Sequence, residues 1–509
     1  MPSHSKSSGT TTKWLALLAV CLAAAAMPLT FTGTAVALPS IGRALGGSPV
    51  AIAWVTNAFM LTFGSTLMAA GALADSYGRK QIFLTGVGSF AVFSLALVFA
   101  PDIVIFDLLR AAQGFAAAAA FSGGMAALAQ EFDGEERLRA FSIVGTSFGV
   151  GLSLGPVASG LMIEMFGWRS IFLAVVVFAV LAFALGWHAL KESRDPASRG
   201  LDWGGALSFT AALGLFTYGI LLAPERGWGD FTVVTLLAGA SLLLVIFVAI
   251  ERMVSRPMLD LSLFAYPRFV GVQLLAAAPA YGFVVLLILL PGRFIGIEGL
   301  REMAAGTLMI ALSAPLLILP IAAGLLTRWF RPATICGTGL LISAGGLFWL
   351  AQIPAGAPLG MIALPMLTIG TGISLPWGLM DGLAVSVVPK ERAGMATGIF
   401  STTRVAGEGV ALAVVGAILS MLIAGRLDAN APLAAIATAA QRLAAGDITM
   451  AANAMPGMDR VALVPLYSQA FSDLLLLLTG ITLLTAIVVF IFLRTDAEET
   501  FEGEVEGSA

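Results

Sequence analysis

Residues 14–38 read WLALLAVCLAAAAMPLTFTGTAVAL, a stretch without a single charged side chain. It is longer than the roughly 18 residues that a helix needs to cross the hydrocarbon of a bilayer. The apolar run continues past Ala26 to Leu38, so it is too long for the h-region of a cleaved signal peptide. We therefore expect a retained membrane helix near the start of the chain.

Thirteen similar stretches follow, and together they decide the class of the protein. The chain is 59% hydrophobic and 11% charged, with a mean hydropathy of +0.96, whereas a soluble domain carries about 25% charged residues. Its exterior must be lipid, where the backbone is satisfied within helices or closed barrels, and the alternating strands of about 10 residues that build barrels are lacking. We therefore predict an all-α membrane protein with 14 transmembrane helices. The predicted spans are 14–38, 50–73, 80–100, 103–129, 138–165, 169–191, 204–223, 230–250, 268–292, 302–326, 332–352, 357–386, 394–423 and 470–494.

The positions of lysine and arginine predict how the chain lies in the membrane. With the N-terminus inside, 17 of the 27 Lys and Arg residues, including all five lysines, fall on the cytoplasmic side and 8 fall outside. Cytoplasmic loops favour these residues. The even number of helices then brings both termini to the cytoplasmic face of the cell (inner) membrane. The net charge of −3 offers no basic surface for nucleic acid.

Two polar breaks, at 192–203 and 251–268, divide the helices into groups of six, two and six. The turns at 71–80 and 324–331 each place a leucine and then charged residues after a glycine. Such weak internal repeats are typical of transporters whose site lies between two related bundles. We expect an N-terminal six-helix bundle (1–191), a linker with two inserted helices (192–267), a C-terminal six-helix bundle (268–494) with a long outer loop (424–469) that includes a short helix at 431–445, and an acidic cytoplasmic tail (495–509).

The turn at 71–80 reads GALADSYGRK and resembles the loop signature of the major facilitator superfamily through Gly71, Asp75, Gly78 and Arg79. Glycine permits a tight turn between helices, and Asp75 is expected to cap or neutralise a helix N-terminus. The usual arginine of the family after this aspartate is Ser76 here. We interpret the turn as a conformational latch rather than as a substrate contact.

The fourth span contains Leu109-Arg110-x-x-Gln113-Gly114, which resembles a second motif of the same superfamily. An arginine inside the bilayer costs about 2.5–3.5 kcal/mol on insertion scales, so Arg110 is expected to face the bundle interior and to have a partner. Asp107 lies three residues earlier on the same helical face. Two interpretations stay open: a local ion pair between Asp107 and Arg110, or a part of a proton relay.

Residues 149–160 read GVGLSLGPVASG and resemble the signature of exporting, proton-exchanging members of the superfamily. Gly151, Gly155 and Gly160 permit close contact between helix backbones, and Pro156 bends the helix. A general small-residue packing motif would supply the glycines without the Gly-Pro pair. We therefore expect a tight, pliable seam between the two halves.

Further matches, and one departure, concern the 14-helix drug:proton antiporter branch of this superfamily. Ala37-Leu38-Pro39, Trp54 and residues 392–398 resemble that branch. The branch usually carries an aspartate in the first helix, where this chain has Thr30. If the chain couples transport to protons, another acid must then carry them.

Two acids in the C-terminal bundle are candidates for that role. Glu408 lies deep in span 394–423 and Asp381 lies in span 357–386. An intramembrane acid is a functional hypothesis by default because it is costly to keep in lipid. For Glu408 the alternative is an ion pair with Arg404, four residues earlier on the same helix.

The resemblance implies a major facilitator fold and multidrug-type, proton-driven efflux of small amphipathic or lipophilic compounds by alternating access. The energy source would be the proton gradient, without a cofactor or metal, and the protein is expected to act as a monomer. Candidates for proton coupling or substrate binding are Glu408, Asp381, Asp107, Arg110 and Arg404. Side chains expected to line the cavity are Thr30, Phe31, Trp54, Phe59, Gln113, Trp377 and Met380.

Two other functions stay open at this stage. A dedicated exporter of one endogenous metabolite or antibiotic would have the same architecture. A non-transporting membrane sensor or assembly protein is compatible with Thr30 in place of the acid. An enzyme is disfavoured because the two histidines, His4 and His188, suggest no metal cluster or nucleophile–base set, and the P-loop motif of ATP-driven proteins is missing.

Overall fold

The computed structural model describes residues 5–132, 134–194, 202–254, 257, 259, 261–387, 393–427, 431–455 and 457–493. Within these ranges all regular structure is helical, and 14 helices are long and apolar enough to cross a membrane. The predicted fold class is therefore confirmed. The acidic tail and most of the polar stretch at 192–203 lie outside the described residues, as do Arg392 and the side chains of 393–398.

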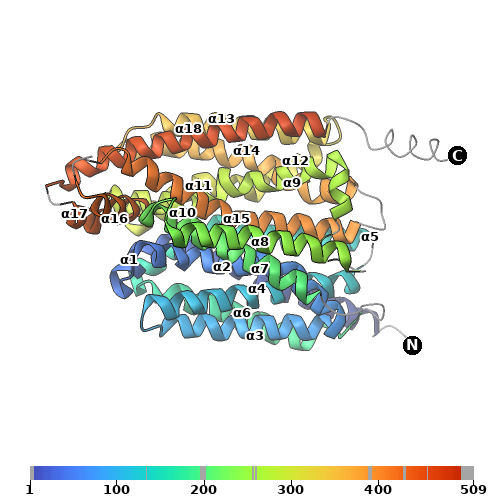
Figure 1. The fold of residues 1–509 in the computed structure, drawn as a ribbon. Coiled ribbons are helices and arrows are strands. Elements are labelled where there is room, and N and C mark those ends of the chain that lie inside the picture. The colour runs from blue at the N-terminus through green and yellow to red at the C-terminus, as the bar shows by residue number, and fades with distance from the viewer. Residues whose placement is uncertain are drawn as a thin grey trace.

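The first bundle occupies the lower part of Figure 1, where α1 packs on α5 and α6 while α4 contacts both α2 and α3. Its six helices are α1 (Ser5–Leu45), α2 (Pro49–Tyr77), α3 (Arg79–Val98), α4 (Ile103–Glu131), α5 (Gly134–Phe166) and α6 (Arg169–Ala189).

The second bundle occupies the upper part of Figure 1 and is less regular. Its helices are α9 (Pro267–Pro279), α10 (Val285–Pro291), α11 (Glu302–Ser313), α12 (Pro315–Leu326), α13 (Pro332–Ala351), α14 (Leu359–Ser386), α15 (Ala393–Ala424), the short α16 (Leu433–Ala444) and α17 (Ile448–Ala454), and α18 (Arg460–Phe492). The short helix α16 lies where one is expected from the sequence. The sequence did not indicate α17, and α18 begins ten residues before the predicted span.

Prolines explain where two spans of the second bundle depart from regular α-helix. Pro279 and Pro291 directly precede the π-helical segments Ala280–Val284 and Gly292–Ile297, which flank α10 within one long span. Proline has no N–H to donate, so the backbone hydrogen bonds must rearrange there. Pro315 interrupts the next span in the same way, between α11 and α12. This bundle is therefore built with local breaks near its centre.

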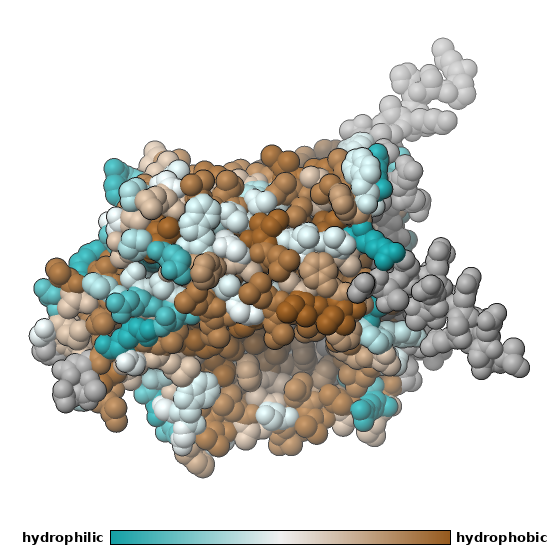
Figure 2. Space-filling model, turned by 90° about the horizontal axis from the view of Figure 1, so that it is seen from above, coloured by the Kyte–Doolittle hydropathy of each residue, from teal (hydrophilic) through white to brown (hydrophobic). Residues whose placement is uncertain are grey.

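The inserted pair, α7 (Trp203–Arg226) and α8 (Phe231–Met253), lies in front of the junction between the bundles in Figure 1. α7 contacts both α2 and α15. α8 is peripheral, because 17% of its most apolar window is buried, against 78% for α2. Figure 2 shows hydrophobic side chains over the middle of one face and hydrophilic ones toward its two ends. This pattern is what a bilayer requires of the surface.

The two ends of the bundle are distinct and are named here by what they carry. The end that holds α16 and α17, at the left of Figure 1, is the α16 end. The opposite end holds the turn between α2 and α3 and is the Gly78 end. The first described residues of α1 and the last of α18 both lie at the Gly78 end, as an even number of spans requires.

Two helix pairs make the most extensive contacts between the halves, α2 with α15 and α5 with α11. A Cβ atom at Gly64 of α2 would lie 2.3 Å from the backbone nitrogen of Ala406 in α15, so only glycine fits at this crossing. Between α5 and α11, Ser153 Oγ donates to the Ser313 carbonyl at 2.5 Å, and Ser313 Oγ lies 3.0 Å from the Ser153 carbonyl. These close contacts hold the halves together along the centre of the molecule.

Candidate functional site

The turn between α2 and α3 is held by a residue that the sequence analysis missed. The carboxylate of Glu192, just beyond α6, accepts hydrogen bonds from the backbone N–H groups of Lys80 and Gln81 at 3.2 and 3.1 Å. Asp75 does not cap this helix as expected, because its Oδ1 accepts instead from Arg79 Nε at 2.9 Å. The turn is thus fixed to the end of α6 within its own bundle.

The glycine motif of α5 faces two different neighbours. Cβ atoms at Gly151 and Gly155 would lie 2.4 and 2.2 Å from atoms of α1, in the same bundle. A Cβ at Gly160 would lie 2.6 Å from a backbone carbonyl of α11, and the Pro156 carbonyl is 2.8 Å from the Cβ position of Gly306. Gly160 and Pro156 therefore belong to the seam between the halves, whereas Gly151 and Gly155 hold α1 close to α5.

A buried polar cluster lies in the middle of the first bundle around Arg110, whose side chain is 0% exposed. Its Nε donates to the Val55 carbonyl at 2.9 Å, and its Nη1 donates to Gln113 Oε1 at 2.5 Å and to Thr30 Oγ1 at 3.3 Å. The ring centroid of Phe59 lies 4.5 Å from the guanidinium carbon, within range of a cation–π interaction. Neutral groups from α1, α2 and α4 thus bind Nε and Nη1, while Nη2 is buried without a partner among the described residues.

An ion pair between Asp107 and Arg110, one of the two interpretations left open by the sequence, is not what holds this cluster. Asp107 Oδ1 is buried and accepts no hydrogen bond from any described residue. The cluster extends instead to α3. Gln113 Nε2 donates to Ser94 Oγ at 2.7 Å, and Ser94 Oγ donates to the Phe90 carbonyl at 2.6 Å. Ser94 was not singled out from the sequence, since a serine in a transmembrane helix usually bonds to its own backbone.

A second cluster lies in the second bundle around Arg404. Its Nη1 lies 3.3 Å from Asp381 Oδ1 on α14, and the rings of Trp377 and Phe400 lie 5.7 and 5.5 Å from its guanidinium carbon. The Asp381 side chain is 57% exposed, whereas that of Arg404 is 15% exposed. Glu408 is not the partner of Arg404, because the arginine turns to a different helix.

Glu408 occupies the middle of α15, one residue before the glycine that packs against α2. The residue is 5% exposed. Its neighbour Gly409 would place a Cβ 3.3 Å from the Leu61 nitrogen of α2, which locates this stretch at the seam between the halves. Among the described residues, none donates a hydrogen bond to the Glu408 carboxylate. A carboxylate in such a place is costly while it is ionised.

The remaining side chains expected to line the cavity are dispersed. Phe31 and Met380 are buried in the packed core. Trp54 lies 6.1 Å from the ring of Tyr218 on α7, so it faces the inserted pair. Trp377 packs edge-on against Phe283 at 6.1 Å and covers Arg404. Thr30, Phe59 and Gln113 gather around Arg110, as described above.

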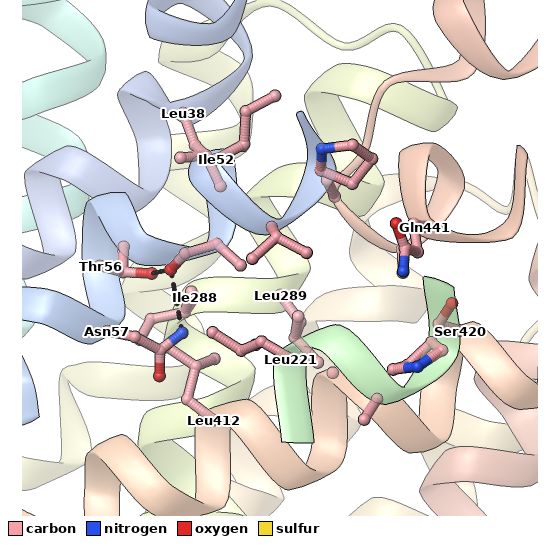
Figure 3. Close-up of a pocket in the computed structure, with 18 residues that line it drawn as sticks. Leu38, Ile52, Thr56, Asn57, Leu221, Ile288, Leu289, Leu412, Ser420 and Gln441 are labelled. Carbon is pink, nitrogen blue, oxygen red and sulfur yellow. Dashed lines mark hydrogen bonds between the residues drawn. The ribbon is translucent and has the colours of Figure 1, made fainter. Parts of the chain in front are cut away.

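The structure also contains a pocket, nearer the α16 end, that the sequence analysis missed. It is lined by residues of both bundles and of α7, and Figure 3 shows Asn57, Ser420 and Gln441 among them. Asn57 could have been singled out, because an asparagine inside a transmembrane helix is costly. Gln441 gave no such signal, since it lies on a short helix outside the predicted spans.

Comparisons with known proteins agree with this architecture. The family model of the Major Facilitator Superfamily matches residues 20–412. The chain is 30% identical over 396 residues to the multidrug resistance protein Stp of Mycobacterium tuberculosis (strain CDC 1551 / Oshkosh), which covers 77% of this chain and 73% of that protein. It is 30% identical over 489 residues to the probable actinorhodin transporter of Streptomyces coelicolor (strain ATCC BAA-471 / A3(2) / M145), covering 91% and 82%.

A solved structure shares the fold. The crystal structure of a bacterial homolog of the human lysosomal transporter Spinster, inward-facing and unoccupied, matches with a TM-score of 0.65 and 16% identity. The match covers 97% of this chain and 98% of that one. At this level of identity the likeness concerns the fold alone.

Proposed function

Because the chain belongs to the Major Facilitator Superfamily, we propose that it exports small amphipathic or lipophilic compounds across the inner membrane in exchange for protons. The proteins of its family and its relatives are transporters of small molecules, not enzymes. The α16 end would face the outside and the Gly78 end, with both termini, the cytoplasm. Rocking of the two bundles about the α2–α15 and α5–α11 seams would expose a central site alternately to each side.

The observation that carries the proton coupling is the position of Glu408. It is a buried carboxyl group, 5% exposed, at the seam where the bundles must move against each other. Arg404, the nearest positive charge along its helix, is engaged with Asp381 at 3.3 Å. A buried carboxyl group without an ion-pair partner is least costly when it carries a proton. We therefore assign the proton-loaded state of Glu408 to this conformation.

The pair Arg404–Asp381 supplies a way to release that proton. Asp381 is on α14 and Arg404 on α15, so a shift between these helices would break their 3.3 Å contact. Arg404 would then be free to approach Glu408, four residues away on the same helix, and would stabilise its ionised form. Coupling requires that binding of a proton to the carboxylate disfavours binding of the substrate, and the reverse. Asp381 serves here as the group that holds Arg404 away.

The Arg110 cluster would serve transport as a fixed positive group. Its guanidinium donates to backbone and neutral side chains from three helices. Asp107, half-buried with one unpaired oxygen, is the second candidate for a proton carrier. It lies on α4 in the same bundle as Arg110, at the opposite side of the seam from Glu408.

The test uses the full chain reconstituted in proteoliposomes that are loaded with a lipophilic fluorescent dye. An imposed pH gradient should drive dye export, and Glu408→Gln should slow it by about tenfold or more, a factor that corresponds to ~1.4 kcal/mol. The matched control is Glu225→Gln, an exposed glutamate near the end of α7, which should transport normally. Gradient-driven export that survives the loss of Glu408, Asp381 and Asp107 together would refute the coupling.

A second candidate is a dedicated exporter of a single antibiotic or endogenous metabolite. It is favoured by relatives whose names specify one compound, such as the probable actinorhodin transporter. A panel of chemically unrelated dyes and antibiotics separates the two. Export of one structural class with no response to the others would replace the multidrug proposal while leaving the role of Glu408 in place.

A further inference from the structure

A pocket of about 90 Å³ lies where all three groups of helices meet, close to the α16 end. Its walls come from α1 and α2 of the first bundle, α7 of the inserted pair, and α10, α15 and α16 of the second bundle. In Figure 3, Asn57 and Thr56 lie on one side, Ser420 and Gln441 lie on the other, and Leu221 and Leu289 lie between them. It is separate from the clusters around Arg110 and Arg404, none of whose charged side chains lines it.

Three polar side chains on these walls have unused hydrogen-bonding capacity. Asn57, Ser420 and Gln441 are 2%, 3% and 7% exposed. Asn57 Nδ2 donates to the Ala53 carbonyl at 2.9 Å, but its Oδ1 is without a partner among the described residues. Ser420 Oγ and both amide atoms of Gln441 are likewise buried and unpartnered there. Buried polar groups are normally satisfied, so this concentration in one pocket indicates a missing occupant.

The chemistry of the walls defines that occupant. Gln441 offers one donor group and one acceptor, Ser420 offers both, and Asn57 offers an acceptor, while the other described walls are mainly aliphatic. None of the described lining side chains is charged, so an ionised group would be desolvated here without compensation. The volume is below the roughly 300 Å³ of drug-binding pockets. The pocket therefore suits one ring with an attached polar group.

We propose that this pocket binds uncharged amphipathic molecules, or one part of them, by hydrogen bonds from an amide, lactam or phenol group to Gln441, Ser420 and Asn57. The proposal rests on the export function proposed above, because it names the chemical class of the exported compound. α16 covers the pocket and is fixed there, since Arg442 Nη2 donates to the Gly47 carbonyl of the first bundle at 2.8 Å. An occupant that bridges α2, α15 and α16 stabilises the arrangement seen here.

Binding can be measured without transport, on the purified full chain in detergent micelles by ¹⁹F NMR. Three probes share one ring: 4-fluorobenzamide, 4-fluorobenzoate and 4-fluorotoluene, with empty micelles to subtract partitioning. The amide should bind at least about tenfold more tightly than the carboxylate or the methyl compound, because only it is both neutral and able to hydrogen-bond. Equal binding of the amide and the methyl compound would overturn the proposal.

Variants locate the binding in this pocket. Gln441→Met keeps the length of the side chain and should weaken 4-fluorobenzamide by about tenfold, whereas Gln352→Met, at an exposed glutamine after α13, should leave it unchanged. If Gln441→Met does not fold, Ser420→Ala, which removes one atom, should weaken the amide by about threefold. Unchanged amide affinity in a folded Gln441 or Ser420 variant would show that the pocket holds only water.

The two proposals fail in different ways. Amide binding that depends on Gln441, together with no dye export under a pH gradient, would leave the pocket in place and remove the export function. Export that depends on Glu408, with no difference between amide and methyl probes, would remove the pocket alone. The binding assay uses no pH gradient, and the export assay uses no NMR probe. The result of one assay therefore does not depend on the result of the other.

Discussion

The two bundles hold their intramembrane arginines in different ways. Arg110 in the first bundle is fully buried and bonded to neutral groups on three helices, including a backbone carbonyl. Arg404 in the second bundle pairs with Asp381, whose side chain is 57% exposed, while Glu408 has no hydrogen-bond or ion-pair partner in the part of the chain that the structure describes. The first arrangement fixes Arg110 through Nε and Nη1, although Nη2 is buried without a partner among the described residues, whereas the second contains a charge pair that can be exchanged.

This difference suggests that the two bundles have different roles in transport. α2 supplies the Val55 carbonyl to Arg110 and, nine residues further on, presents Gly64 to α15. α15 carries both Arg404 and Glu408. The fixed cluster would therefore position α2 as a rigid partner against which α15 moves, and the exchangeable pair would sense that movement. Four predictions test this contrast, beginning with the largest expected effect.

Arg110→Met should have the largest effect, because it removes the centre of the fixed cluster. Gln113 Oε1 would lose its donor, and a buried acceptor left unsatisfied costs about 1–3 kcal/mol. The Val55 carbonyl would lose the contact to Arg110 and keep only the hydrogen bond of its own helix. We expect dye export to fall by about a hundredfold and the melting temperature in detergent to drop. Arg110→Lys should not restore either, because an ammonium cannot reproduce the forked contacts of guanidinium. Arg226→Met, at an exposed position, is the control; a stable and active Arg110→Met protein would contradict the fixed role.

Asp381→Asn should come next, with about a tenfold loss of gradient-driven export. It frees Arg404 to pair with Glu408 on the same helix, which would hold the carboxylate ionised and prevent its protonation. Combining it with Arg404→Met removes the cation through which Asp381 acts, so the double variant should export no more slowly than Arg404→Met alone. Initial rates of dye efflux for the unmodified protein, the two single variants and the double variant form a double-mutant cycle. Strictly additive losses would mean that Arg404 never approaches Glu408.

The sequence was sufficient to predict the membrane helices, but it was insufficient to predict the side-chain contacts between them. Apolar runs and prolines fix where spans lie, since lipid leaves the backbone no alternative to helix. The pairs Asp107–Arg110 and Arg404–Glu408 were open alternatives because their members lie three and four residues apart on one helix. The structure instead brings Val55 and Asp381 from other helices, and Glu192 reaches the α3 terminus from 112 residues away. Such contacts depend on packing that local spacing cannot reveal.

Gly64→Ala should have a moderate effect, since it acts on the seam that connects the two clusters. Its Cβ would lie 2.3 Å from the backbone nitrogen of Ala406, which cannot move as a side chain tip could. Overpacking of this kind costs about 1–3 kcal/mol, so we expect a lower melting temperature and export reduced by a few fold. Gly145→Ala on α5 is the matched control, because the Cβ would meet no atom of the described structure within 4 Å. Equal behaviour of the two variants would argue against tight packing of α2 on α15.

Ser94→Ala should have the smallest effect and sharpens the contrast most directly. It removes one contact of the fixed cluster, the 2.7 Å hydrogen bond from Gln113 Nε2, and its own bond to the Phe90 carbonyl. Ser241→Ala, at an exposed position of α8, loses only the equivalent bond to its own helix, so the difference between the two reports the Gln113 contact together with the burial of Ser94. We expect that difference to be about 1 kcal/mol in the free energy of unfolding. The ratio of dye export with and without a pH gradient should stay unchanged, because this cluster positions α2 and carries no exchangeable proton. A change in that ratio would place the Arg110 cluster in the proton pathway and remove the distinction between the two bundles.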